Sequence, residues 1–210
     1  MKQFILFLLI SASTCAVAPL HAQTQEELMA KAMAANVVGK EHDILKAMEG
    51  EWEETFYYQM APDQPVMTVV SKAKVKMILG GRFAQVKGQA TMMGETSERL
   101  SILGHDNRRG VYTIDGFDTY GTYAIHAEGK YIEATKSIIL EGVENDPLMP
   151  HSMKFRMVFR FPDANTMESE IWFLTGMNGE EVENKAVWST AKRVEEKDKK
   201  SKKGKKGKKK

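Results

Sequence analysis

Short segments in which apolar and polar residues alternate fill most of this chain, and they constrain its fold more than any other feature. They run from Trp52 to Val194 with no helical pattern between them. Turn-forming residues separate them, as at Gly80-Gly81 and Asn178-Gly179. About ten strands at hairpin spacing predict a mainly β fold, an antiparallel meander that closes into a barrel or folds into a sandwich.

The segment before these strands has a different period. Residues 25–36 and 40–48 place apolar side chains at helical spacing, which predicts two short helices. We therefore expect four parts. They are a signal peptide at 1–22, a helical segment at 23–50, a single β domain at 51–194 and a disordered lysine-rich tail at 195–210.

The hairpin around the turn at Pro162–Thr166 has the best-determined register. If Phe161 faces Met167, one face is apolar and the other pairs charges and places an arginine on an indole. The apolar face carries Phe155, Met157, Phe159, Phe161, Met167, Ile171 and Phe173, and the polar face carries Arg156, Arg160, Glu168, Glu170 and Trp172. Either the apolar face fills a core, or the polar face lines a cavity for one small ligand.

The N-terminus has the layout of a secretory signal. Lys2 precedes an apolar run from Phe4 to Pro19, and Leu20 and Ala22 stand where a signal peptidase reads small or aliphatic residues. The run is too short for a confident membrane span. We expect cleavage after Ala22 and a periplasmic or secreted protein. Lipidation at Cys15, the only cysteine, is the alternative, although the residues before it fit a lipobox poorly.

Charge is unevenly distributed. Residues 197–210 hold ten lysines and one aspartate, a charge of +9, and Lys2 adds +1, so residues 23–196 carry −8 of the net +2. The tail lacks arginine for bidentate contacts and aromatic rings for stacking on bases. This composition therefore argues against nucleic acid as a partner. It favours weak, salt-sensitive attachment of the tail to anionic surfaces of the cell envelope.

The usual catalytic signatures are missing from the sequence. There is no G-x-S-x-G, G-x-G-x-x-G or P-loop motif, and a chain cleaved after Ala22 has no cysteine. The remaining histidines, His42, His105, His126 and His151, are far apart in the sequence. His105 and Asp106 are adjacent, so in a strand they point to opposite faces. We expect no catalytic residue, metal site or cofactor. The sequence leaves open whether the protein is an enzyme, and it favours a protein without catalytic activity.

Several segments together resemble an uncharacterised bacterial group, domain-of-unknown-function family 1579. They are GKEHDILKAMEGEW (39–52), KMILGGRF (76–83), ILGHDNRRGVYTID (102–115) and the run from 154 to 193. The resemblance implies a lipocalin-like antiparallel barrel and no established reaction. Its pattern residues here are His42, Trp52, Arg82, Asp106, Asp115, Arg156 and Glu170. The chain departs from the pattern at His105, where the family commonly has Tyr, and at Thr113-Ile114, where it commonly carries a Trp. If that Trp helps to shape a cavity, the cavity of this member differs.

These observations favour an exported, noncatalytic barrel that binds a small apolar or amphipathic ligand. Fourteen methionines support a soft, adaptable lining. The candidate ligand-binding residues are Trp52, Arg82, Asp115, Arg156, Glu170 and Trp172. One alternative is a small-molecule enzyme in which Arg156, Glu170 and Asp115 converge in one pocket. The other is an envelope protein that docks through its lysine-rich tail.

Overall fold

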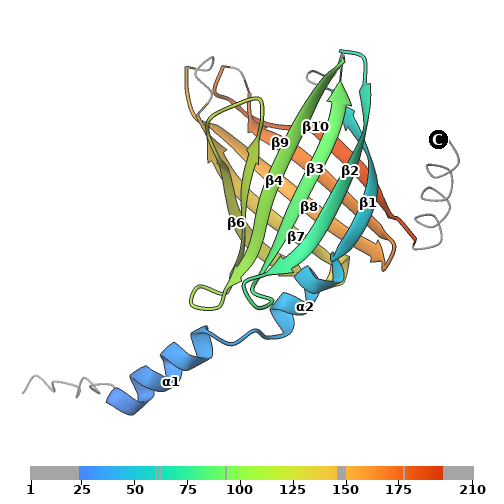
Figure 1. Ribbon diagram of the computed structural model, residues 1–210. Helices are drawn as coiled ribbons and strands as arrows, with labels where there is room; N and C mark the ends of the chain where they lie inside the picture. The colour runs from blue at the N-terminus through green and yellow to red at the C-terminus, as the bar shows by residue number, and fades with distance from the viewer. Residues whose placement is uncertain are drawn as a thin grey trace, which may run out of the picture.

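Ten antiparallel strands form one closed barrel (Figure 1). The computed structural model describes residues 24–195 except 60, 62, 93, 146–149 and 177. Each strand pairs with the next along the chain, and β10 returns to pair with β1. The strands are β1 (Gly50–Tyr58), β2 (Met67–Ile78), β3 (Phe83–Met92), β4 (Glu95–Asp106), β5 (Val111–Asp118), β6 (Ile125–Ile132), β7 (Ser137–Glu144), β8 (Met153–Asp163), β9 (Thr166–Thr175) and β10 (Glu181–Arg193). The predicted meander is confirmed, and it closes as a barrel and not as a sandwich.

Strand β2 shows how the sequence period builds the wall. Its buried positions are Val69, Ser71, Ala73 and Val75, and the lysines between them face solvent. Successive side chains of a strand point to opposite faces, so one face of β2 meets the interior from Val69 to Val75. The pairing with β1 opposes Ser71 to Glu54 and Ala73 to Trp52, which fixes the height of these side chains in the barrel.

The register predicted for the β8–β9 hairpin is confirmed over six pairs, from Phe155↔Phe173 to Arg160↔Glu168. It differs at Phe161, because an irregularity between Arg160 and Asp163 removes the expected partner Met167. Phe155, Met157 and Phe159 belong to the interior packing. The alternating arginines therefore lie on the outer wall. Glu168 and Glu170 border the interior cavity, but alternation directs the side chains of the polar face outward, as the simpler of the two interpretations expects.

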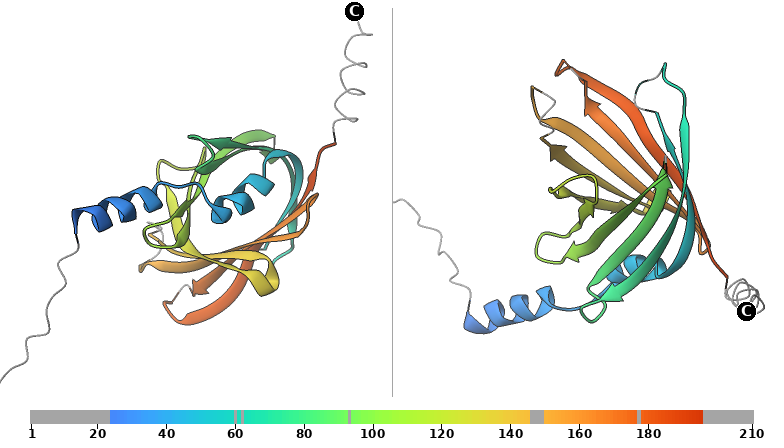
Figure 2. Two further views of the ribbon diagram at one scale, coloured as in Figure 1. Left: turned by 90° about the horizontal axis from the view of Figure 1, so that it is seen from below. Right: turned by 45° about the horizontal axis from the view of Figure 1, so that its top comes forward.

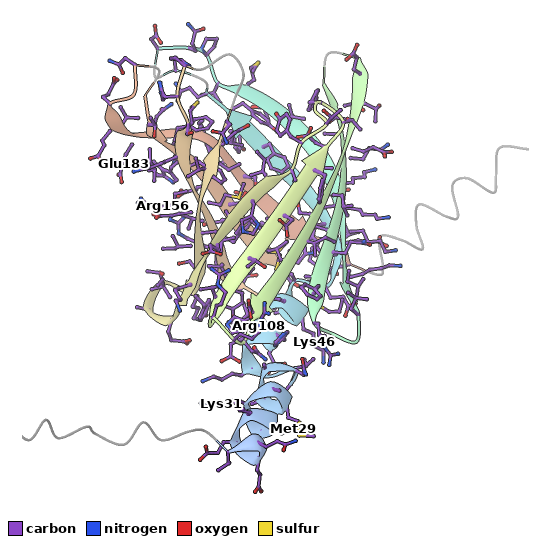
Figure 3. The ribbon with its side chains drawn as sticks, turned by 90° about the vertical axis from the view of Figure 1, so that its left-hand side faces the viewer. Met29, Lys31, Lys46, Arg108, Arg156 and Glu183 are labelled. Atoms are coloured by element: carbon purple, nitrogen blue, oxygen red, sulfur yellow. The ribbon has the colours of Figure 1, made fainter. Side chains whose placement is uncertain are left out.

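Two helices precede the barrel, α1 (Gln25–Ala35) and α2 (Lys40–Ala47), close to the two that the sequence predicts. Thr24 and Glu27 form a capping box at the start of α1. No residue of α1 is buried, and Figure 3 shows it standing clear of the barrel with Met29 and Lys31 on its surface. Helix α2 lies across one end of the barrel, seen from below in Figure 2. Leu45 of α2 is fully buried there.

Trp52 and Arg193 seal the end of the barrel that α2 covers. The Trp52 indole Nε1 donates to the Met48 carbonyl at 2.9 Å, and the Arg193 guanidinium lies 4.2 Å from the centre of the indole ring. Arg193 also donates to the carbonyls of Ala47 (2.8 Å) and Glu49. The Ala47 carbonyl belongs to the last turn of α2, where helix carbonyls lack partners within the helix, and the Glu49 carbonyl lies just after it. The arginine therefore ties α2 to the last strand.

The linker between the helices is held to the β4–β5 turn. Asn107 Nδ2 donates to the Val37 carbonyl at 2.7 Å, so its Oδ1 faces His105 Nδ1 at 2.8 Å. The imidazole must donate in this contact. His42 Nδ1 accepts from the Gly39 amide at 3.2 Å, and the two histidine rings meet edge to face, 5.9 Å apart. The contact with Gly39 thus requires an unprotonated Nδ1 on His42.

We expect the stability of the barrel to fall below neutral pH because of His42. Burial, and next the nearby His105, lower the pKa of His42 below its ordinary value of 6.5. A depressed histidine pKa means that the unfolded chain binds the proton more readily. The stabilising contribution is complete above pH 6.5 and is lost as the pH falls toward the folded-state pKa.

Thermal unfolding between pH 7.5 and pH 5.0 measures this effect. The variant His42→Asn keeps an acceptor for the Gly39 amide and cannot gain the proton, so its melting temperature should depend less on pH. An unchanged pH dependence in this variant would contradict the assignment to His42.

None of the helices in the described part of the chain is long and apolar enough to cross a membrane. The expected signal peptide (1–22) lies outside the described residues, as does the lysine-rich tail from residue 196 onward.

Candidate functional site

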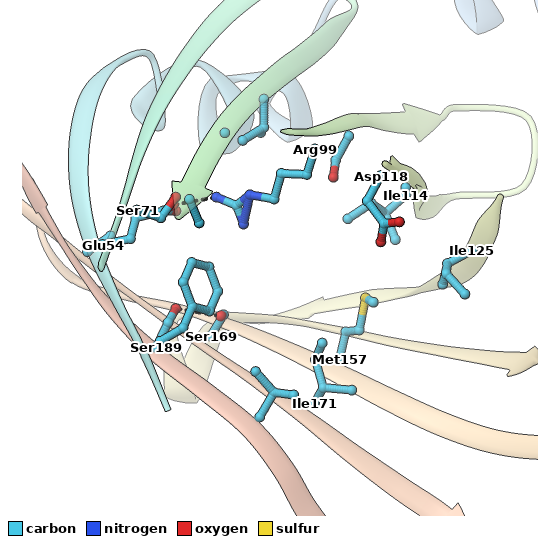
Figure 4. Close-up of a pocket in the computed structure, with 18 of the residues that line it drawn as sticks. Glu54, Ser71, Arg99, Ile114, Asp118, Ile125, Met157, Ser169, Ile171 and Ser189 are labelled. Carbon is cyan, nitrogen blue, oxygen red and sulfur yellow. Dashed lines mark hydrogen bonds and ion pairs between the residues drawn. The ribbon is translucent and has the colours of Figure 1, made fainter. Parts of the chain in front are cut away.

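A cavity of about 340 Å³ occupies the barrel interior. It extends from Met48, just after α2, to Tyr58, Tyr120 and Tyr123 at the opposite end of the barrel. Tyr120 and Tyr123 lie in the connection between β5 and β6, and more than half of each side chain is exposed. The barrel is thus sealed at one end and accessible at the other, and Figure 4 shows the residues between.

Apolar side chains form most of the cavity wall. They come from nine of the ten strands and from the residue that follows α2. As in β2, the alternation of side chains along each strand turns them toward the interior. The set is Met48, Phe56, Val75, Val86, Leu103, Ile114, Ile125, Met157, Phe159, Met167, Ile171, Val187 and Ala191. Three of them are methionines, whose flexible thioethers adapt to irregular ligands.

A belt of polar groups crosses this apolar wall at mid-height. Its charged members are Glu54 of β1 and Arg99 of β4, which form an ion pair through Oε2 and Nη2 (Figure 4). β2 and β3 lie between β1 and β4 in the sheet, so the pair reaches over these two strands on the inner wall. The belt also contains four serines, Ser71, Ser101, Ser169 and Ser189. Ser169 and Ser189 share a hydrogen bond of 2.8 Å, and Ser71 donates to the Gln89 carbonyl at 3.1 Å.

Arg99 is placed by the strand beside it. Arg99 pairs with Gly88 of β3 in the sheet, and any Cβ at position 88 would overlap the Arg99 side chain. The arginine stem therefore lies flat over β3, and its guanidinium centre is 4.9 Å from the centre of the Phe56 ring. The buried Arg99 Nε has no hydrogen-bond partner. Buried donors of this kind are rare in folded proteins.

Tyr58 stands between the polar belt and the open end. Burial is the main cause that raises its pKa above 10.0, with smaller contributions of the same sign from Tyr120, Glu54 and Asp118, and Arg99 opposes them. The phenol is therefore neutral at physiological pH and can donate a hydrogen bond. Within the described residues, no group of three histidine, cysteine, aspartate or glutamate side chains is placed to hold a metal ion.

Four of the six predicted site residues lie on the outer wall. Arg156 pairs with Glu141 (3.0 Å) and Glu183 (3.2 Å), and Figure 3 shows it outside the barrel. Glu170 accepts from the Trp172 indole at 3.0 Å and pairs with Arg160 and Lys185. Asp115 binds His126 Nδ1 at 2.8 Å on another part of the wall. Arg156, Glu170 and Asp115 therefore do not converge in one pocket.

The other two predicted residues lie near the sealed end. Trp52 is 1% exposed and belongs to the packed core beneath the cavity. Arg82 donates to the carbonyls of Asn36 (3.0 Å) and Leu79 (3.3 Å). It borders a separate polar hollow of about 320 Å³ beside the helix linker, together with His42 and His105. Both residues act on the helical segment and neither lines the barrel cavity.

The residues that do characterise the cavity, Glu54, Arg99 and Asp118, were not predicted. The alternation of residues along β1 and β4 could have revealed Glu54 and Arg99 as inward-facing charges. Glu54 shares a face with Trp52, Phe56 and Tyr58 in EWEETFYY, and Arg99 shares a face with Ser101 and Leu103 in ERLSILGH. A charged residue inside an otherwise inward-facing series marks a buried polar site.

The sequence profile of a protein family of unknown function, DUF1579, matches residues 38–193. The chain belongs to this family. The match covers the whole barrel and α2, as the sequence resemblance implied. A comparison with curated proteins finds no match.

Solved structures with the same architecture support a lipocalin-like fold. Rv2717c from M. tuberculosis is similar at a TM-score of 0.55 and 12% identity, over 76% of this chain and 100% of that one. The S-type phycobiliprotein lyase CPES from Guillardia theta is similar at a TM-score of 0.52 and 8% identity, over 79% of this chain and 97% of that one.

Proposed function

We propose that this DUF1579 member is an exported, noncatalytic barrel that binds a small apolar or amphipathic molecule in its interior. The observation that carries the proposal is the cavity, which has one sealed end and one accessible end. Its volume of about 340 Å³ lies within the range of small-molecule sites, which are lined mostly by apolar groups with a few polar groups that orient the ligand.

The arrangement of the polar groups favours binding over catalysis. The enzyme alternative needs Arg156, Glu170 and Asp115 in one pocket, and these residues lie on the outer wall with other partners. At 12% and 8% identity the solved barrels support only the fold. The proposal therefore rests on the lining and on the export that the N-terminal sequence predicts.

Native mass spectrometry of the protein purified from its own exported fraction tests this function. We expect a mature chain that begins at Gln23 and carries an added mass that solvent extraction removes. The variant Ser101→Phe adds a ring inside the cavity, and the added mass should fall by about tenfold or more, since the ring takes the space that a ligand needs.

The matched control is Thr68→Phe, which puts the same ring on the exposed outer face of β2. This variant should keep the added mass. A bare chain in all three proteins, together with no uptake of a neutral fluorescent naphthylamine, would contradict the proposed function. A chain that retains residues 1–22 in that fraction would contradict cleavage.

A further inference from the structure

The charged side chains inside the cavity are few and can be counted by strand alternation. Glu54 of β1, Arg99 of β4 and Asp118 at the end of β5 are on inward-facing positions of strands that line the cavity. Other carboxylates near it, such as Glu170, have their side chains on the outer wall. Two negative charges and one positive charge thus face the space that a ligand would enter.

Glu54 and Arg99 cancel each other. The glutamate is 7% exposed and forms its ion pair with Arg99 inside the barrel. A buried carboxylate needs such a partner, because an unpaired charge away from water is costly. The positive charge of Arg99 is therefore already neutralised by Glu54. The carboxylate of Asp118 remains as the one uncompensated charge among these three side chains.

Asp118 is held at the accessible end. Its Oδ1 accepts from the Tyr120 amide at 2.8 Å, which fixes the carboxylate at the start of the β5–β6 connection. Arg99 is its partner residue across the β4–β5 ladder, yet no lysine or arginine of the described chain forms an ion pair with Asp118. Figure 4 shows its carboxylate turned toward the cavity.

Aromatic residues lie at the same end of the cavity as this carboxylate. Tyr58, Tyr120 and Tyr123 line the same end of the cavity, and the second and third are 63% and 58% exposed. The faces of such rings attract cations, and Arg99 over Phe56 already uses this attraction deeper inside. A carboxylate among tyrosine rings is the arrangement that recognises amines and quaternary ammonium groups.

Building on the proposed function, we infer that the ligand is an amphipathic cation, with its apolar part in the barrel and its amine or quaternary ammonium group between Asp118 and the three tyrosines. A carboxylate head group would instead meet the uncompensated charge of Asp118 at the mouth. The charge of −8 on residues 23–196 also attracts cations toward the barrel.

Three ligands that share a ten-carbon chain test this inference by calorimetry at low salt: decyltrimethylammonium, decanol and decanoate. We expect the cation to bind about tenfold more tightly than decanol, and decanoate to bind most weakly. In Asp118→Asn the advantage of the cation should disappear while the affinity for decanol is unchanged.

Glu133→Gln is the control, because it removes the same charge from the short 3₁₀ turn Glu133–Thr135 between β6 and β7, where the residue does not line the cavity. It should preserve the preference for the cation. Tightest binding of decanoate, which would indicate capture by Arg99, would overturn the inference and leave the proposed function intact. An undiminished preference in Asp118→Asn would also overturn it. Failure of all three ligands would overturn the proposed function as well.

Discussion

Replacing Trp52 by alanine is expected to lower the free energy of unfolding by about 3–5 kcal/mol. The indole is 1% exposed, donates to the Met48 carbonyl and lies beneath the Arg193 guanidinium. Its removal leaves a void at the sealed end and deprives both α2 and Arg193 of their shared contact. Urea unfolding followed by circular dichroism measures the loss.

Trp172→Ala is the matched control. This indole lies on the outer wall, where it donates to Glu170 and contacts Lys185. Its truncation should cost about 1 kcal/mol, since little packing volume is lost. Equal losses in the two variants would contradict the view that the end covered by α2 holds the barrel closed.

Gly129→Ala is expected to destabilise the barrel by about 3 kcal/mol or more. Gly129 of β6 faces Leu140 of β7, and a Cβ at this position would overlap the Ile139 carbonyl oxygen and approach the Leu140 backbone. Backbone atoms cannot rotate away as a side chain can, so the two strands must separate. Differential scanning calorimetry should show a clearly lower melting temperature.

Gly116→Ala, on the neighbouring strand β5, provides the comparison. A Cβ there would meet Ser101 Oγ and Ile125 at 3.8–3.9 Å, which is ordinary contact. This substitution should change stability by no more than about 1 kcal/mol, because the methyl group fits and the unfolded chain loses freedom. If both variants unfold alike, close approach of β6 and β7 is not the reason for glycine at position 129.

The two ends of the barrel differ in a way that matters for binding. Trp52, Arg193 and α2 close one end through packed rings and satisfied carbonyls. The other end exposes Tyr120 and Tyr123 around Asp118. Under the proposed function, a ligand would enter at the accessible end without opening the sheet.

Local pattern was sufficient for much of the wall. The alternation in β2 and the register of β8–β9 follow from side-chain period and cross-strand pairing, which the sequence displays directly. The register failed only at Phe161, where the strand is irregular before Asp163. Such an irregularity depends on the turn geometry and leaves no mark in the alternation.

The predicted binding residues show the limit of this reasoning. Arg156, Glu170 and Trp172 were chosen because they share a polar face, but alternation is the same whichever face turns inward. Closure of the sheet decides the question, because Phe155, Met157 and Phe159 then pack together inside. The charged face is left to solvent, where its ion pairs form.

By itself the sequence determined the strand period, the hairpin order and the acidic barrel segment between basic ends. Only the tertiary structure decided that the barrel closes around a cavity and that Glu54 and Arg99, 45 residues apart, meet on its inner wall. β2 and β3 lie between their strands, so no cross-strand pairing rule joins them. The pair forms because the curved wall turns both side chains toward the same interior, where the buried carboxylate of Glu54 needs a charged partner.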